Sequence, residues 1–224
     1  MPCRFYFIRH GRTQYNLEHR FQGGRADSPL VASGIDGAKA AGDYLSTTQF
    51  SAVYSSPQQR ALDTAKYIVA ANQWQPPIQI DDGLREFDFG DWDGKQEAEV
   101  QPQSYAQVIF TKPAEYRPEL AGGGESYADF VTRTTSTLHR LIDQVGVAST
   151  QPLLIVSHGL VTTMTVKALM GVPVAELRAP FVVDGQVMKT VGHGIVDNDS
   201  LTVLSTTDNQ HFELTTWNET GYLK

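Results

Sequence analysis

The sequence predicts an α/β fold: a three-layer α-β-α sandwich with a mainly parallel central sheet and helices on both of its faces. Two observations support this prediction. Short runs of β-branched and aromatic residues alternate along the chain with longer segments of helical periodicity. The run from Pro152 to Val156 is apolar almost throughout, which is typical of an interior strand buried on both faces. A chain of 224 residues could build one large domain or two small ones, and we interpret residues 1–224 as a single domain.

The predicted strands follow from their apolar and β-branched composition. Those expected in the parallel part of the sheet are residues 4–9, 52–55, 78–80 and 152–156. The tail from Ile195 to Trp217 alternates between apolar and polar residues on both sides of Asp208-Asn209. This pattern predicts a C-terminal hairpin that turns at Asp208-Asn209.

The predicted helices lie between these strands, at residues 31–46, 56–69, 125–145 and 161–170. Ser56-Pro57 predicts the start of the second helix, because serine is a good N-cap and proline suits the first helical position. Val31 offers no such cap to the first helix, for which Ser33 is the candidate substitute. Gly171 is expected to end the last helix.

Positive charge is concentrated at the start of a chain that is acidic overall. The formal net charge is −7 at pH 7, yet residues 1–25 hold five arginines against one acid, Glu18, which makes this segment about +4 (five minus one). The arginines are Arg4, Arg9, Arg12, Arg20 and Arg25. A small positive region in an acidic protein indicates a pocket for a small anion and argues against a nucleic-acid partner.

Cysteine content and hydropathy indicate the compartment in which the chain works. The single cysteine, Cys3, excludes an intramolecular disulfide and fits a reducing compartment. No apolar stretch approaches the roughly 20 residues needed to span a bilayer, and no secretory leader opens the chain. We therefore expect a cytoplasmic protein with no membrane partner.

Reactive side chains are predicted to gather at one edge of the sheet. Arg9 and His10 follow the first strand, and His158 follows the buried apolar strand. Arg60 lies in the first turns of the second helix, and Glu86 comes after the third strand. The carboxyl ends of parallel strands share one edge of a sheet, where ligands bind. Two histidines, arginines and a carboxylate suit phosphoryl transfer, which needs cations around the oxygens, a nucleophile and an acid for the leaving oxygen.

Five short blocks carry these residues in a fixed order. They are Phe7-Ile8-Arg9-His10-Gly11-Arg12-Thr13 with Asn16, Ser55-Ser56-Pro57 with Arg60-Ala61, Leu84-Arg85-Glu86 with Phe89-Gly90, Gly124-Glu125-Ser126, and Val156-Ser157-His158-Gly159. Together they resemble the motifs of the histidine phosphatase superfamily, the phosphoglycerate-mutase-like proteins. The resemblance covers nearly the whole chain and implies a phosphoglycerate-mutase-like fold, with residues 1–224 as one histidine phosphatase domain.

The resemblance implies a role for each matched residue. His10 is the nucleophile that becomes a phosphohistidine, and Glu86 protonates the leaving alcohol and then activates water. The groups assigned to the phosphoryl oxygens are Arg9, Arg60, His158, Asn16, Gln22, Gly23 and the backbone N–H of Gly159. Neither a metal nor a cofactor is implied, and the expected partner is a small phosphorylated substrate.

Elementary chemistry fits these roles. A nucleophilic imidazole must be neutral, and neighbouring arginines lower the pKa of His10. One ring nitrogen of His10 is expected to donate to a backbone carbonyl, so that the other presents its lone pair. The two arginines are expected to grip oxygens through their planar forks. Burial beneath Phe87, Phe89 and Trp92 is expected to raise the pKa of Glu86.

Residues 87–124 are interpreted as a cap insertion that decides substrate specificity. Mutases of the family carry an Arg-Arg pair there to hold an acidic phosphoglycerate, whereas Lys95, Lys112 and Arg117 are well separated in this chain. The segment is rich in aromatic residues, which suits a phosphomonoester with a partly apolar leaving group. We therefore predict an acid-type phosphatase acting on small phosphorylated metabolites. The alternatives are a 2,3-bisphosphoglycerate-dependent phosphoglycerate mutase and a non-catalytic module that binds phosphorylated proteins.

Some of these residues, and other charged residues of the chain, also have alternative interpretations. A metal site built from His10, His158 and Glu86 is disfavoured, because adjacent arginines repel a cation. Arg12 and Arg20 either steer anions or pair with nearby acids. Four histidines have no companions that suggest chemistry: His19, His139, His193 and His211. The sequence leaves a homodimer open.

Overall fold

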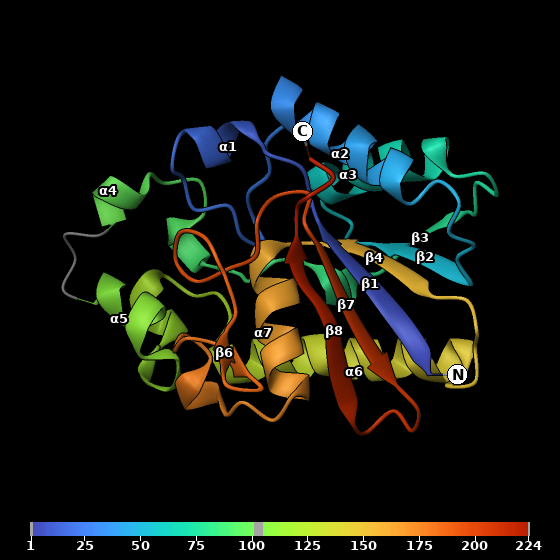
Figure 1. Ribbon diagram of the computed structural model, residues 1–224. Coiled ribbons are helices and arrows are strands. Elements are labelled where there is room, and N and C mark those ends of the chain that lie inside the picture. Colours follow the sequence, from blue (N-terminus) through green and yellow to red (C-terminus); the bar gives the residue numbers. More distant parts are fainter. Residues whose placement is uncertain (1, 101–104, 224) are drawn as a thin grey trace.

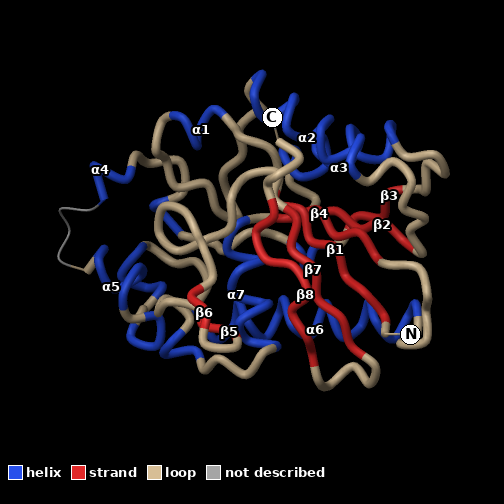
Figure 2. Tube along the Cα trace, viewed as in Figure 1, coloured by secondary structure: helices blue, strands red, loops and turns tan. Residues whose placement is uncertain are grey.

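A six-stranded sheet forms the centre of the computed structural model, which describes residues 2–100 and 105–223. The strands follow the order β3-β2-β4-β1-β7-β8 (Figures 1 and 2). They are β1 (Cys3–Arg9), β2 (Ala52–Ser55), β3 (Ile78–Ile80), β4 (Leu153–Ser157), β7 (Leu201–Thr206) and β8 (Phe212–Glu219). The first four in the sequence are parallel, whereas β7 runs antiparallel to both of its neighbours. The predicted mainly parallel sheet and C-terminal hairpin are therefore confirmed.

Four long helices flank this sheet, namely α2 (Ala32–Tyr44), α3 (Gln59–Ala71), α6 (Tyr127–Val145) and α7 (Gly159–Leu169). Shorter elements lie mostly beyond the carboxyl edge of the strands (Figure 1). They are α1 (Gln14–Leu17), η1 (Asp82–Leu84), η2 (Gly90–Trp92), α4 (Glu97–Val100), α5 (Ala106–Thr111), η3 (Pro113–Glu115), η4 (Pro118–Ala121), η5 (Val174–Glu176) and the small hairpin of β5 (Val182–Val183) and β6 (Gln186–Val187).

Different helices cover the two faces of the sheet, because successive side chains of β1 point to opposite sides. Phe7 belongs to an apolar cluster with Leu138 of α6 and Val166 of α7. Its neighbour Ile8 belongs to a second cluster with residues of α2 and α3, including Ile68. The predicted three-layer sandwich is thus confirmed, with α2 and α3 on one side and α6 and α7 on the other.

A third apolar cluster ties the segment 87–124 to the helices α6 and α7. The Phe87 ring lies 5.0 Å from the ring of Tyr127 and 5.2 Å from that of Phe130, centroid to centroid. Tyr116 packs against Phe87 and Trp92 in the same cluster. Aromatic packing of this kind adds specific geometry to apolar burial, so the segment shares a second core with α6 and α7 beside the sheet.

One predicted helix start is wrong. α3 begins at Gln59, with Gln58 as its N-cap, two residues later than the Ser56-Pro57 signal indicates. The hydroxyl of Ser56 is instead hydrogen-bonded to the ring of His158, 2.8 Å away. A tertiary contact has therefore taken the group that the local sequence offers as a cap. α2 also begins without a side-chain cap, so Ser33 does not replace Val31.

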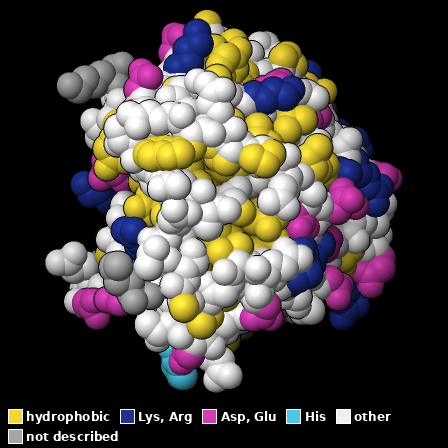
Figure 3. Space-filling model, turned by 90° about the vertical axis from the view of Figure 1, so that its right-hand side faces the viewer, with side chains coloured by type: hydrophobic (Ala, Val, Ile, Leu, Met, Phe, Trp, Pro, Cys, Tyr) yellow, Lys and Arg dark blue, Asp and Glu magenta, His cyan; other side chains and the backbone are white. Residues whose placement is uncertain are grey.

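The surface on the β3 side of the molecule mixes charges of both signs. Figure 3 shows Lys and Arg side chains interleaved with Asp and Glu, with apolar groups between them. This face presents no concentrated positive area of the kind that nucleic acids bind. None of the described helices is long and apolar enough to cross a bilayer.

Candidate active site

The two predicted histidines meet at the carboxyl edge of the sheet. β1 and β4 are neighbours that pair in register, with Arg9 opposite Ser157. The residue that follows each of these strands is a histidine: His10 follows β1, and His158 follows β4. His158 is also the N-cap of α7. The ring centroids of His10 and His158 lie 5.2 Å apart. Strand pairing alone thus brings together two residues that are far apart in the sequence.

His10 is held as a neutral imidazole with a defined tautomer. Its Nδ1–H donates to the carbonyl of Gly11 at 2.8 Å, as expected, and its Nε2 accepts from Arg60 Nε at 3.2 Å. Burial is the largest cause that lowers the pKa of His10 well below its usual value, followed by the charges of Arg60 and Arg9. The neighbouring arginines lower the pKa of His10 as expected from the sequence, but burial has the larger effect. Nε2 therefore carries a lone pair at neutral pH.

Arg60 is almost fully immobilised before any ligand binds. Its Nη1 donates to Asp27 Oδ1 at 2.9 Å and to the carbonyl of Ala26 at 3.0 Å. Its Nη2 faces the carbonyls of Gln22 and Gly23. The expectation that Arg60 grips oxygens through a planar fork is therefore wrong, because its fork is taken by the loop 22–27. Only Nε is directed at His10, which leaves one well-placed donor.

Arg9 keeps more of its guanidinium free. Nη1 donates to the carbonyl of Val196 at 2.6 Å, while Nε is buried with no partner among the residues described. Gly159 makes this position possible, since a Cβ there would lie 3.2 Å from Arg9 Nε and 2.9 Å from Ile195 Cδ1. Burial lowers the pKa of Arg9 to about 10, so the side chain stays charged near neutral pH. An unpaired buried N–H beside His10 suits an oxyanion.

His158 is completely buried beside His10. Its Nε2 is hydrogen-bonded to Ser56 Oγ, while its Nδ1 has no partner within residues 2–100 and 105–223. Burial, followed by the charge of Arg60, lowers the pKa of His158 well below its usual value. The ring is thus neutral. Its Nε2 is fixed by Ser56, which directly follows β2, and its Nδ1 is available for a ligand.

Glu86 reaches the same site from the loop after η1. Its Oε1 accepts from the backbone N–H of Phe87 at 2.9 Å and its Oε2 from that of Leu160, in the first turn of α7, at 3.1 Å. Gln58 fixes the backbone of Glu86 by accepting its N–H at 2.9 Å. Burial raises the pKa of Glu86 and outweighs these two hydrogen bonds, which lower it. Arg85, the preceding residue, forms an ion pair with Asp82 at 3.0 Å and not with Glu86.

The remaining predicted phosphate ligands are placed unequally. Asn16 and Gln22 both line the cavity in front of His10. Asn16 Oδ1 accepts from Asn198 Nδ2, which also donates to the carbonyl of His10 at 2.9 Å. Gly23 is turned away, since its N–H donates to Asp93 Oδ1 at 2.6 Å. The sequence offered no signal for Asn198, which comes from the loop before β7.

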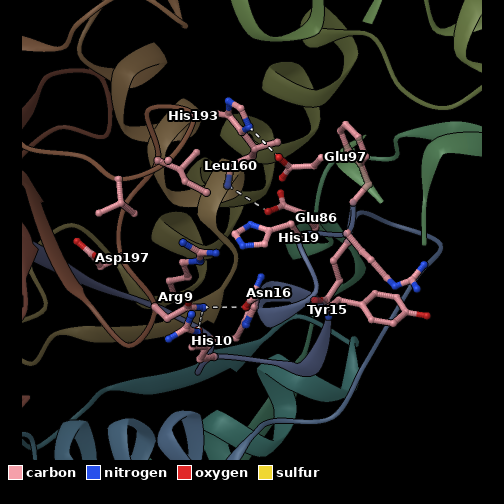
Figure 4. Close-up of a pocket in the computed structure, with 18 of the residues that line it drawn as sticks. Arg9, His10, Tyr15, Asn16, His19, Glu86, Glu97, Leu160, His193 and Asp197 are labelled. Atoms are coloured by element: carbon pink, nitrogen blue, oxygen red, sulfur yellow. Dashed lines mark hydrogen bonds and ion pairs between the residues drawn. The ribbon is translucent and has the colours of Figure 1, made fainter. Parts of the chain in front are cut away.

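A cavity of about 600 Å³ opens in front of His10. Figure 4 shows Arg9, His10 and Asn16 toward one end, Glu86 near the middle, and Glu97 with His193 at the other end. Arg60 and His158 stand behind this lining, in contact with the His10 ring. A cavity of this size can enclose a ligand much larger than phosphate.

The outer end of the cavity contains residues that the sequence argument set aside. His193 Nε2 lies 3.2 Å from Glu97 Oε2, and its ring stacks on Phe110 with centroids 4.0 Å apart. His19 and Arg178 line the same space. The described part of the segment 87–124 therefore supplies one wall, and residues from the stretches 15–22 and 178–198 supply others. Lone histidines in loops carry no periodic signal, so only the tertiary structure could find them.

The site offers donors and few acceptors. Within the described part of the chain, no group of three or more His, Cys, Asp or Glu side chains is arranged to hold a metal ion. Arg9 and Arg60 both lie close enough to His10 for their charges to lower its pKa, and Arg60 is paired on its far side with Asp27 at 2.9 Å. Arg9 forms no ion pair with a carboxylate among the described residues, and a buried, unpaired cation beside His10 suits an anionic ligand such as a phosphoryl group.

Comparison with known proteins adds a family match. The family described as "Histidine phosphatase superfamily (branch 1)" matches residues 5–220 of this chain. A glucosyl-3-phosphoglycerate phosphatase of Mycolicibacterium vanbaalenii is 34% identical over 176 residues, which cover 76% of this chain and 76% of that protein. An adenosylcobalamin/alpha-ribazole phosphatase of Escherichia coli is 31% identical over 181 residues, which cover 81% of this chain and 85% of that protein.

Solved structures show the same architecture. The mycobacterial glucosyl-3-phosphoglycerate phosphatase in complex with inorganic phosphate superposes with a TM-score of 0.79 at 28% sequence identity. The alignment covers 98% of this chain and 99% of that one.

Proposed function

Because the chain belongs to the histidine phosphatase superfamily (branch 1), we propose that it is a phosphatase that hydrolyses small phosphomonoesters through a phosphohistidine at His10. One observation carries this proposal. A neutral His10 with its Nδ1 anchored to a carbonyl and its Nε2 lone pair facing Arg60 lies at the end of a cavity that also contains Glu86. Nucleophile, cation and acid are thus in one place.

The first step transfers the phosphoryl group to the enzyme. His10 Nε2 attacks phosphorus, the bond from phosphorus to the ester oxygen breaks, and the electron pair leaves with that oxygen. The Nε–H of Arg60 moves from its contact with Nε2 to a phosphoryl oxygen. The free Nε–H of Arg9 and the unpartnered Nδ1 of His158 are proposed to bind the other oxygens. Charge developing in the transition state then meets donors that are already in position.

Glu86 completes the proton balance of both steps. In the first step its carboxyl group gives a proton to the leaving alcohol oxygen. In the second step the resulting carboxylate takes a proton from water, whose oxygen attacks phosphorus as the bond to His10 Nε2 breaks. Phosphate leaves, His10 is neutral again and Glu86 is protonated again. Burial of Glu86 favours the protonated form that the first step needs.

Trapping of the intermediate tests this proposal. The enzyme is mixed with p-nitrophenyl phosphate, quenched in base during turnover, and digested for mass spectrometry under conditions that preserve phosphohistidine. We expect phosphate on the peptide that contains His10 and none in His10→Ala. Steady turnover with no phosphorylated His10 at any quench time would contradict the mechanism.

A mutase assay distinguishes the proposed phosphatase from its main alternative, a phosphoglycerate mutase. The three cations of the segment 87–124 are Lys95, Lys112 and Arg117, and the cavity lining from this segment is instead Phe89, Glu97 and Phe110 within its described part. This lining lacks the basic pair expected for phosphoglycerate isomerisation, and we expect hydrolysis of 3-phosphoglycerate to exceed isomerisation with 2,3-bisphosphoglycerate present. Robust isomerisation would favour the mutase. Failure to hydrolyse any aryl phosphate at pH 5–7 would favour the non-catalytic module.

The proposal includes a cytoplasmic enzyme that needs neither metal nor cofactor. A homodimer stays a prediction, for which light scattering on a sizing column is the measurement.

A further inference from the structure

Arg178 is a fixed cation in the outer cavity. It belongs to the loop after η5 and lines the cavity together with Phe110 and His193. Its Nε donates to Tyr127 Oη at 2.6 Å, and its Nη1 donates to the carbonyl of His193 at 2.9 Å. Its guanidinium carbon lies 5.7 Å from the ring centre of Phe110 and 5.5 Å from that of Tyr127. Two hydrogen bonds and two aromatic faces therefore hold the charged group in one orientation.

A buried lysine fixes the backbone on both sides of Arg178. Lys167 of α7 is only 2% exposed, and its Nζ donates to the carbonyls of Leu177 and Ala179, each at 2.7 Å. These are the two residues that flank Arg178. Burial of an ammonium group is costly, and here it serves to hold a short loop that presents a second cation.

The charge of Arg178 is not neutralised within the described structure. A guanidinium has five N–H bonds, and the two hydrogen bonds above use two of them, on Nε and Nη1. Both acceptors are uncharged, and no carboxylate lies within ion-pair distance of Arg178 among residues 2–100 and 105–223. Glu97, the acid at this end of the cavity, pairs with His193 instead (Figure 4). The end of the guanidinium can thus receive a carboxylate through two parallel hydrogen bonds.

We propose that Arg178 forms a second anion-binding subsite in the outer cavity, and that the leaving alcohol of the substrate carries a carboxylate. This inference rests on the proposed phosphatase function, because it names the substrate class of the same cavity. It also revises the expectation from the sequence that the leaving group is partly apolar. That expectation considered only residues 87–124, whereas the cation comes from the loop 177–179. Lys167 is the positioning residue that holds this loop.

Two matched pairs of substrates test the subsite. 3-Phosphoglycerate and glycerol 3-phosphate differ only by a carboxylate in place of a hydroxymethyl group. 6-Phosphogluconate and glucitol 6-phosphate differ in the same way at the end of a longer chain, which covers a greater reach. We measure kcat and KM for all four with the wild type, Arg178→Gln and Arg178→Lys. Arg117→Gln is the control, because it removes a cation from the segment 87–124 that is outside the cavity lining.

The wild type should prefer the carboxylate member of at least one pair by about 10- to 100-fold in kcat/KM, as a charge-assisted contact allows. Arg178→Gln should abolish that preference through a higher KM, Arg178→Lys should retain part of it, and Arg117→Gln should leave it intact. Hydrolysis of p-nitrophenyl phosphate shows that each variant has folded.

Two results would overturn the subsite while leaving the phosphatase proposal in place. One is a wild type that hydrolyses p-nitrophenyl phosphate and shows no preference in either pair. The other is a preference that survives in Arg178→Gln. A wild type inactive on every phosphomonoester would overturn both proposals.

Discussion

The two ends of the cavity are built in opposite ways. At the inner end, His10 and His158 are fixed by the ends of paired strands. At the outer end, Arg178 and His193 stand on loops that are held by side chains such as Lys167 and Glu97. The proposed chemistry is thus anchored in the sheet, whereas the proposed recognition of the leaving group depends on contacts between loops. Changes at the inner end should act on kcat, and changes at the outer end should act on KM and on local stability.

The largest effect is expected for His10→Ala. The proposed nucleophile has no substitute, because the neighbouring His158 is fully buried behind the cavity lining with its Nε2 bound to Ser56. We expect turnover of p-nitrophenyl phosphate to be lost with little change in melting temperature. His211→Ala, which removes an exposed histidine, is the matched control. Substantial residual turnover in His10→Ala would break the contrast between the two ends.

Glu86→Gln should affect substrates according to their leaving groups. General acid catalysis contributes about 10²–10⁴-fold, so alkyl phosphates should slow by this factor, whereas p-nitrophenyl phosphate needs little protonation and should slow much less. The activity of the wild type on alkyl phosphates should also fall as pH rises through the raised pKa of Glu86, because the acid form is lost. Equal losses for both substrate classes would remove Glu86 as the acid. Glu119→Gln, on the exposed surface of η4, is the control.

Lys167→Met should separate the outer end from the inner one. The substitution leaves the carbonyls of Leu177 and Ala179 without their donor. We therefore expect the free energy of unfolding, measured by urea titration, to fall by about 2–3 kcal/mol. If the Arg178 loop is loosened, KM for the preferred carboxylate substrate should rise more than kcat falls. A fall in kcat with an unchanged KM would show that the two ends are not separable in this way.

A smaller, pH-dependent effect is expected at Asp199, which is buried with Oδ1 unpartnered in the described structure. Burial raises the pKa of Asp199 to about 8. Between about pH 4 and pH 8 the unfolded chain loses this proton while the folded chain keeps it, so stability falls as pH rises. The free energy of unfolding should fall between pH 5 and pH 8, and Asp199→Asn should reduce this fall by about 2 kcal/mol, measured by urea titrations at both pH values. Parallel slopes in both proteins would argue against an unpaired carboxyl there.

Chelation should have the smallest effect of all. Guanidinium groups already supply the positive charge around His10, so we expect EDTA to leave the rate unchanged with p-nitrophenyl phosphate. Strong inhibition that is reversed by added metal would contradict the proposed mechanism.

How far the sequence predicts the structure also differs between the two ends. Strands carry a clear apolar signal, so the positions of Arg9, His10 and His158 at one sheet edge could be read in advance. Ser56 shows the limit, because its local pattern indicates a helix cap while the fold gives its hydroxyl to His158. Arg60 shows the same limit, because its two Nη groups, expected to bind a phosphoryl group, donate to the loop 22–27 instead.

The outer end could not be predicted because nothing local marks it. His193 gains its position from Glu97 and Phe110, which come from another segment of the chain. Arg178 depends on a lysine whose burial no periodicity reveals, since α7 is buried along most of its length. Such contacts arise only when loops distant in sequence are packed together.

The position of α7 has a consequence for how selectivity could diverge. Its first turn holds Glu86 through Leu160, and its last turn holds the Arg178 loop through Lys167. Given the proposed roles of Glu86 and Arg178, we expect substitutions in α7 to disturb turnover and substrate choice together. α5 contributes Phe110 to the outer cavity and holds no residue of the proposed catalytic group. Laboratory evolution toward new substrates should therefore accumulate its first tolerated changes in α5 and spare α7.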